Sequence, residues 1–392
     1  MNRKSNPIIS IVVATKDRYV YLFKLIEYFR NSISSDDIEF VIQDNTLNNL
    51  EIIQFLKINQ DQRIKYFHYP KWISMSDNFD KGIYNSTGDY VTLIGDDDGF
   101  LPWIVDLCFW LKNENIDAVV TKKPHYIWSD IGANIWLKGT DGQLTYHKHN
   151  LNVEEISLLN QRKLVLKNAA VSMEKLPRVY HGIVSRKKMD NLREKCGNFF
   201  PGGSPDMANA IALLEFISNP VYLNFPVIIT GNGYNSAGGQ GIRGKHHGEI
   251  KSKTFLPKNA SENWESKVPH YWSGGTIYAE SAIKAFTSSG RKDLVEKFNY
   301  NYLYAHCLVF DRLYLKDIFE KIKKEIQNQP LSLFIILFYF IKIFFVRANT
   351  FIKNFIYNKL NLSNSDIKNF ETINLASEFL IKEFEHKNKP WG

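Results

Sequence analysis

Short apolar segments alternate with amphipathic segments through the first 120 residues, and this alternation constrains the fold more than any other feature. The apolar segments predict strands over Ile8–Ala14, Ile38–Gln43, Ile64–His68, Tyr90–Ile94 and Asp117–Thr121. Between them lie predicted helices at 19–30, 50–58, 77–84 (capped by Ser76) and 102–112. In the first helix Leu22, Ile26 and Phe29 share one face. Strands that alternate with helices predict a doubly wound, mostly parallel central sheet with flanking helices.

Three aspartates follow the strand Tyr90–Ile94 almost directly. Asp96, Asp97 and Asp98 stand in a row, before Gly99 and Pro102. Adjacent like charges are costly unless water or a cation neutralises them. Ligands of open α/β sheets bind beyond the carboxyl ends of the strands. The pattern therefore predicts a divalent-metal and phosphate site, with a solvated acidic turn as the alternative.

Composition and missing motifs exclude several other classes. No GxGxxG or GxxxxGK[ST] follows the first strand, which disfavours dinucleotide-binding and P-loop proteins. The three cysteines are far apart, so neither a zinc site nor a disulfide framework is indicated. The net charge of +8 predicts anionic partners, either nucleotide phosphates or an acidic membrane surface. No dense basic run suggests nucleic-acid binding, and the N-terminus lacks a signal-peptide core.

Later segments have distinct patterns. Residues 122–166 are irregular and predict excursions from the sheet edge, and 180–186 predict a strand that enters a helix. Asp206 follows a turn-rich loop just before a predicted helix at 207–216. A strand broken by Pro226 is predicted at 221–230. Residues 231–248 are rich in Gly, Asn, Ser and His and predict a mobile loop.

The C-terminal third is predicted to be helical and contains the apolar run Pro330–Val346. Roughly 20 apolar residues are needed to span a bilayer. This run is shorter, contains Lys342 and is flanked by basic residues on both sides. It therefore predicts a helix lying in the interface of an anionic membrane. A core helix or an oligomer contact is the alternative.

Four stretches together resemble a family 2 glycosyltransferase with the GT-A fold, a Rossmann-like architecture. The resemblance covers about Ile8–Phe216 and is carried by ISIVVATKDR at 9–18, FVIQDNT at 40–46, NFDKGIYNSTGDYV at 78–91 and the aspartate triplet before Leu101–Pro102. The last of these is similar to the family's DxD motif. The family often has Asp-Ser-Asp-Asp here, and counting back from Pro102 puts Gly95 where its first Asp would stand.

The resemblance implies roles for particular residues. Asp96 is placed on the ribose side, and either Asp97 or Asp98 on a bound Mn²⁺ or Mg²⁺. The family's catalytic base usually belongs to a Glu-Asp pair, and Asp206 occupies that place with Pro205 instead of Glu. The other predicted donor-binding residues are Thr15, Asp17, Arg18, Asp44 (which would recognise uracil), Asn78 and Lys81. Weaker candidates are His181 and Arg186 on the acceptor side, and the loop residues His246 and His247.

The predicted function is inverting, metal-dependent sugar transfer from a UDP-sugar to a hydroxyl of a lipid-linked glycan, in capsule or O-antigen biosynthesis. The enzyme would act peripherally at the cytoplasmic face of the inner (plasma) membrane. Two domains are predicted. Residues 1–250 form a GT-A domain, in which 1–121 bind the nucleotide and 122–250 bind the acceptor, and residues 251–392 form a helical region with a membrane-associating helix near 330–358. The alternatives are a nucleotidyltransferase acting on sugar phosphates and an inactive membrane-associated binding protein on the same fold.

Overall fold

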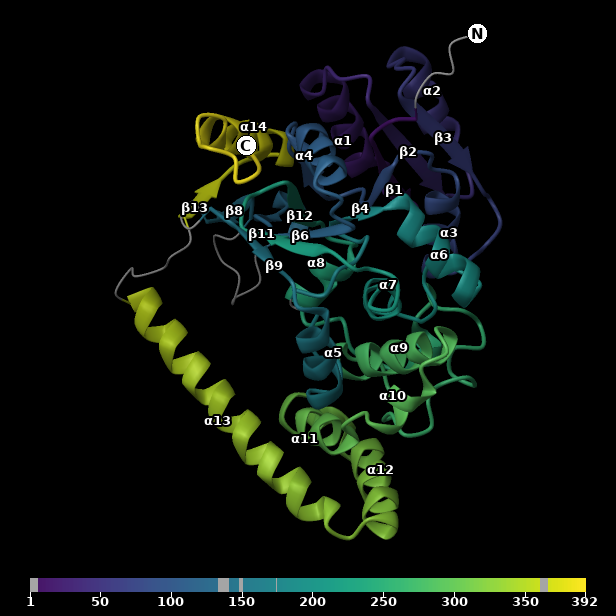
Figure 1. Cartoon of the computed structure of the whole chain (residues 1–392), viewed down its shortest axis with the longest axis vertical. Helices are drawn as coiled ribbons and strands as arrows, with labels where there is room; N and C mark the ends of the chain where they lie inside the picture. The colour runs from purple at the N-terminus through teal and green to yellow at the C-terminus, as the bar shows by residue number, and fades with distance from the viewer. Residues whose placement is uncertain (1–5, 133–140, 148–150, 174, 360–365) are drawn as a thin grey trace.

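The computed structural model describes residues 6–132, 141–147, 151–173, 175–359 and 366–392. Its centre is an eight-stranded sheet with the strand order β3-β2-β1-β4-β10-β6-β11-β9 (Figure 1). The strands are β1 (Ile9–Thr15), β2 (Ile38–Asp44), β3 (Ile64–His68), β4 (Tyr90–Gly95), β6 (Ala118–Thr121), β9 (Val153–Glu155), β10 (Gly182–Ser185) and β11 (Pro220–Leu223). The strands from β3 to β4 are parallel, whereas β10 runs antiparallel to both β4 and β6.

Side chains of the central strands alternate between two cores. In β1, Ile11 and Val13 belong to the core under α1 (Tyr19–Ser32), α2 (Leu50–Ile58) and α4 (Ile104–Asn113). Val12 and Ala14 belong to the opposite core, under α3 (Met75–Tyr84), α6 (Arg186–Cys196) and α7 (Pro205–Leu213). Every residue of β1, β2 and β4 is buried, as expected for strands covered by helices on both faces.

A second, five-stranded sheet lies beyond the aspartate triplet. Its order is β13-β8-β7-β12-β5, formed by β5 (Gly99–Phe100), β7 (His125–Ile127), β8 (Gln143–Tyr146), β12 (Ile228–Asn232) and β13 (Asp366–Asn369). The hairpin of β7 and β8 accounts for part of the irregular segment 122–166. β5 directly follows the triplet and pairs with β12, so this sheet covers the carboxyl end of β4.

The C-terminal part is mostly helical, as predicted. Its helices are α9 (Gly274–Ser288), α10 (Lys292–Glu296), α11 (Tyr300–Phe310), α12 (Leu315–Asn328), α13 (Ser332–Lys359) and α14 (Ile373–Phe384), with short 3-10 turns η2 (Ile250–Ser252) and η3 (Arg312–Tyr314). After α13 the chain returns to the N-terminal half: β13 pairs with β8, and α14 packs against α1 and β5. In Figure 1, α13 runs along one side of the molecule from α12 towards β13.

Three local predictions differ from the structure. The cap of α3 is Ser74 rather than Ser76, because the Ser74 hydroxyl accepts the Asp77 backbone N–H at 3.2 Å. The glycine-rich segment 231–248 contains a short helix, α8 (Ala237–Ile242), capped by Ser236. Residues 122–166 also contain the helix α5 (Leu158–Lys167) and the 3-10 turn η1 (Ser129–Ile131). In both α3 and α8 the true cap is the serine whose hydroxyl reaches the N–H three residues on.

Candidate active site

The triplet is buried where β4 ends, between the two sheets. Asp96 accepts a hydrogen bond from the Thr15 hydroxyl at 2.6 Å and forms an ion pair with Arg18 at 2.8 Å. Burial raises the pKa of Asp96 to about 7, although Arg18 opposes the shift and Asp97 adds to it. For Arg18, burial works to lower the pKa, but Asp96 and Asp97 outweigh it and the net shift is upward. Arg18 therefore holds the first carboxylate beside the loop after β1.

Asp98 is the most fully bonded residue of the triplet. One carboxylate oxygen accepts the backbone N–H of Gly231 at 2.7 Å. The other lies 2.6 Å from both the Gly95 N–H and the His181 Nε2. These bonds join β4, β12 and the segment before β10. They indicate that Asp98 organises the site through hydrogen bonds as well as through charge.

Asp97 lies beside Gly233, Ser236 and Arg18. Its Oδ2 accepts the Gly233 N–H at 2.8 Å, and its Oδ1 lies 3.6 Å from Arg18 Nη1, beyond hydrogen-bond length. Burial raises the pKa of Asp97, and Arg18 opposes that shift. Because Arg18 is too far away to donate a hydrogen bond to Oδ1, the lone pairs of this oxygen remain open to a metal ion. This makes Asp97 the better candidate for a metal ligand.

The described residues contain no group of three or more His, Cys, Asp or Glu side chains arranged to hold a metal ion. Mg²⁺ is usually held in proteins by one or two carboxylates together with substrate phosphates. The lone pairs of Asp97 Oδ1 satisfy that requirement, and Asp98 Oδ1 keeps one lone pair besides its hydrogen bond from Gly231. The residues present therefore fit a divalent cation that is completed by a diphosphate.

Asp206 lies in the first turn of α7, where Pro205 opens the helix. Its Oδ1 accepts the Ser204 hydroxyl and, at 2.8 Å, the Met207 N–H. The charge of Asp206 raises the pKa of Tyr278 in α9, and burial adds to the shift. The contacts with Ser204 and Met207 fix the carboxylate at a helix N-terminus.

Tyr180 and Lys123 connect Asp206 to the triplet. Burial raises the pKa of Tyr180, and Asp98, Asp97 and Asp206 all add to the shift. Burial lowers the pKa of Lys123 to about 7, with Arg178 lowering it further and Asp98 and Asp206 opposing. The pKa values of Tyr180 and Lys123 are therefore both shifted by Asp98 and by Asp206. This indicates that the two carboxylates lie near the same pair of side chains. Lys123, which follows strand β6, was not predicted as a site residue. Its position after a central strand could have indicated it, because ligands of such sheets bind beyond the carboxyl ends of the strands.

The remaining donor candidates lie around the end of β2 and the start of α3. Asp44 is buried and accepts hydrogen bonds from the Tyr19 and Tyr66 hydroxyls at 2.6 and 2.7 Å. Asp17 has a left-handed backbone (φ 56°), and its N–H donates to the Thr46 hydroxyl at 2.8 Å. The cap position of α2 is Asn49.

On α3, Asn78 donates to the Thr15 carbonyl at 3.4 Å. Its Oδ1 is buried without a hydrogen-bond partner among the described residues, and Asn78 therefore offers an acceptor beside Thr15. The Lys81 ammonium lies over the Tyr69 ring at 4.5 Å.

Three weaker candidates have other partners. Arg186 donates to the Ile83 and Ser86 carbonyls, each at 2.8 Å, so its guanidinium links α6 to the end of α3. His246 accepts from the Trp272 indole at 3.3 Å. His247 lies 3.9 Å from Asp311, on the side of α11. The hydrogen bonds of Arg186 and His246 link parts of the fold, whereas His247 is half exposed.

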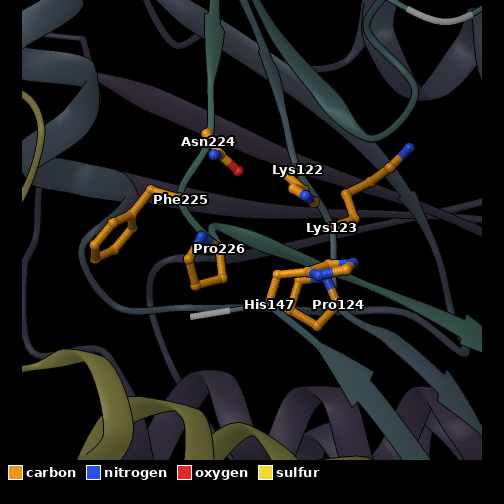
Figure 2. A pocket seen from close by; sticks show the side chains of 7 residues that line it. All are labelled: Lys122, Lys123, Pro124, His147, Asn224, Phe225 and Pro226. Atoms are coloured by element: carbon orange, nitrogen blue, oxygen red, sulfur yellow. The ribbon is translucent and has the colours of Figure 1, made fainter. Parts of the chain in front are cut away.

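A pocket beside this region is too small for a substrate. Figure 2 shows it between the ends of β6 and β11, with the Lys123 side chain extending away from Phe225 and Pro226. Its volume of about 10 Å³ is roughly enough for one water molecule. The site is therefore defined by the carboxylates rather than by this pocket.

Residues 10–152 match the model of Glycosyl transferase family 2. Together with a doubly wound sheet whose strand β4 ends in a carboxylate cluster, this match supports a nucleotide-sugar glycosyltransferase. The predicted resemblance, the GT-A class of fold and the enzyme class are confirmed. No curated protein sequence matches the chain significantly.

The chain is also similar to solved structures of S. aureus TarS. The TarS 1-349 complex with UDP-GlcNAc has 13% identity and a TM-score of 0.46, with 82% of this chain and 92% of that chain covered. TarS 1-349 alone has 12% identity and a TM-score of 0.43, over 82% and 91%. For the complex with UDP the values are 12% and 0.41, over 57% of this chain and 60% of that chain. The assignment rests on the family match.

Gly231 allows β12 to approach the triplet. A Cβ at this position would lie 1.6 Å from the Asp97 carbonyl oxygen, whereas one at Gly241 in α8 would meet nothing within 4 Å. We expect Gly231→Ala to lower the free energy of unfolding by at least about 1–3 kcal/mol, the usual cost of overpacking. Gly241→Ala should have little effect. Thermal unfolding of both variants measures this, and equal midpoints would contradict the packing described here.

Proposed function

We propose that the chain is an inverting, metal-dependent glycosyltransferase that uses a UDP-sugar donor and a hydroxyl of a lipid-linked glycan as acceptor. The observation that carries the proposal is the arrangement of Asp97, Arg18 and Asp206 around the end of β4. Donor binding would use Thr15, Asp17, Arg18, Asp44, Asn78, Lys81, Asp96 and Asp97. The boundary between a GT-A domain and a helical region near residue 250 also belongs to the proposal.

Asp97, with Asp98 behind it, would hold Mn²⁺ or Mg²⁺. The chemistry that such an ion supplies is neutralisation of the charge on the leaving diphosphate. Arg18 already lies against Asp96 and Asp97, and it would offer the diphosphate a second cation. Asp96 and the Asn78 carbonyl, both beside Thr15, would accept hydrogen bonds from the nucleotide sugar.

Asp206 would act as the general base. The Ser204, Met207 and Tyr278 contacts fix it, so that its carboxylate can accept the proton of the acceptor hydroxyl. A single base and one displacement at C1 give inversion of configuration. Tyr180 and Lys123, whose pKa values respond to both Asp206 and Asp98, would line the space for the acceptor.

Membrane association is proposed from α13. The stretch Ser332–Lys353 is long and apolar enough to cross a membrane, with a mean hydropathy of 1.8, and little of it is buried. Phe334 and Phe345 are 70% and 65% exposed. A helix of 28 residues measures roughly 42 Å. Its length alone therefore does not decide between spanning and lying on the surface.

The two ends of α13 favour the surface. α12, before it, packs against α11, and β13, after it, pairs with β8. A spanning helix would put α12 and β13 on opposite sides of the bilayer, although both belong to one folded body. This supports a helix that lies in the interface of an anionic membrane. The proposed location is accordingly peripheral, at the cytoplasmic face of the inner membrane, where capsule or O-antigen precursors would be extended.

The double variant Phe334→Asp/Phe345→Asp should lose at least about tenfold in binding to phosphatidylglycerol vesicles, because charged residues are poorly accommodated in the apolar layer. The matched control is Ile58→Asp/Leu159→Asp, which alters two exposed apolar residues away from α13. Vesicle sedimentation measures both. If the two double variants bind equally well, α13 is not the membrane contact.

Calorimetric titration with UDP tests the donor site without any knowledge of the acceptor. We expect UDP to bind more tightly with Mn²⁺ than without it. Absence of UDP binding in the presence of Mn²⁺ would contradict the proposal and favour an inactive binding protein on this fold.

A further inference from the structure

An apolar groove opens where α13 diverges from α11. Its volume is about 630 Å³, within the range of about 300–1,000 Å³ usual for small-molecule sites. The apolar lining consists of Val309, Phe310, Leu313, Phe344, Ala348, Phe351 and Ile352. Leu313 is 90% exposed, which is unusual for a leucine in a folded chain. The groove therefore has room for a hydrocarbon chain and apolar walls to hold one.

Two arginines also line the groove, and they differ in what they contact. Arg347 of α13 donates to the Val309 carbonyl at 2.9 Å and packs over the Phe310 ring at 4.6 Å. It therefore links α13 to α11, the two helices that form the walls of the groove. Arg312 of η3 is exposed and forms no ion pair with the described residues. Its guanidinium is available to an anion beside the groove, and guanidinium groups bind phosphate well.

The charge of α13 agrees with an anionic ligand. Between residues 332 and 353 the only charged side chains are Lys342, Arg347 and Lys353, all basic. The groove is continuous with the exposed apolar side chains of α13, because Phe344, Phe351 and Ile352 belong to both. A molecule held there would have its chain among apolar residues and its anionic group on the basic side.

We propose that this groove binds the hydrocarbon chain of a phosphate-bearing lipid, with Arg312 contacting the phosphate. The inference rests on the proposed function, since the occupant would be the lipid portion of the lipid-linked acceptor. Binding in this groove would fix the acceptor next to the enzyme independently of the sugar that is recognised at Asp206. The helix α13 then has two roles: its outer face contacts the membrane and its inner face selects one lipid.

Equilibrium dialysis of the full chain against farnesyl phosphate tests the groove, with farnesol and inorganic phosphate as partial ligands. Ala348, on the groove wall, is replaced by Trp to fill the cavity, and exposed Thr350 of the same helix is replaced by Trp as the matched control. We expect Ala348→Trp to weaken binding at least tenfold and Thr350→Trp to leave it within twofold. Arg312→Gln should reduce the preference for farnesyl phosphate over farnesol.

Three outcomes would overturn the inference: equal binding by the two Trp variants, equal affinity for farnesol and farnesyl phosphate, or displacement of the lipid by inorganic phosphate alone. Vesicle binding by Ala348→Trp should persist, because the outer face of α13 is unchanged. UDP binding by the same variants separates the two proposals. If the wild type does not bind UDP, the proposed function is wrong. If the wild type binds UDP but Ala348→Trp and Thr350→Trp bind farnesyl phosphate equally well, only the lipid site is wrong.

Discussion

Replacing Asp206 by Asn should lower the rate of sugar transfer by about 10²–10⁴-fold, the usual contribution of a general base. The amide has no basic oxygen to take the acceptor proton. Its carbonyl can still accept hydrogen bonds from Ser204 and Met207, so the loop and the start of α7 should keep their geometry. Thermal unfolding and UDP affinity should therefore remain those of the wild type.

The matched control is Asp106→Asn. Asp106 occupies the first turn of α4, as Asp206 does in α7, but it is exposed and pairs with Lys389. Steady-state rates of both variants, measured with the same donor, give the comparison. Full activity in Asp206→Asn would show that another group takes the proton, and the mechanism would be wrong.

Asp97→Asn and Asp98→Asn should both lower activity, but only Asp98→Asn should also lower stability. Asp97 Oδ1 lies 3.6 Å from Arg18, beyond hydrogen-bond length, so the replacement of Asp97 should remove a metal ligand and lower the rate by at least about 10²-fold. Its unfolding temperature should change little. Asp98 accepts hydrogen bonds from Gly231, Gly95 and His181, and an amide nitrogen cannot accept them.

A buried donor that loses its acceptor costs about 1–3 kcal/mol, so Asp98→Asn should reduce the stability of the protein as well as its activity. Thermal unfolding and Mn²⁺ titrations of activity on both variants measure the difference. A loss of Mn²⁺ dependence confined to Asp98→Asn, with normal stability, would assign the metal to Asp98 instead of Asp97.

The sequence was informative wherever the signal is local. Strand and helix periodicity placed β1 to β4 and α1 to α3 within a few residues, because burial on both faces leaves a continuous apolar run such as Tyr90–Ile94. The same pattern put the triplet at the carboxyl end of a strand. The match to the family over residues 10–152 confirms that the motifs in this region carry its resemblance.

Contacts between distant residues could not be read in this way. Asp98 accepts a hydrogen bond from the N–H of Gly231, 133 residues further along the chain. Such a bond cannot be predicted from the sequence pattern, because every residue except proline has a backbone N–H. The pairing of β13 with β8 joins residues more than 200 positions apart. The sequence pattern showed that α13 is apolar. It did not show that the elements on either side of α13 pack against the rest of the fold, α12 against α11 and β13 against β8. The predicted roles of the individual site residues remain predictions.

The most direct test of the central claim is product analysis with a panel of sugar nucleotides, with Mn²⁺ and with or without a lipid-linked acceptor. We expect metal-dependent release of UDP from one UDP-sugar, faster with acceptor, and a transferred sugar with inverted configuration at C1. Release of pyrophosphate from a nucleoside triphosphate and a sugar phosphate, with no release of UDP, would contradict it and identify a nucleotidyltransferase.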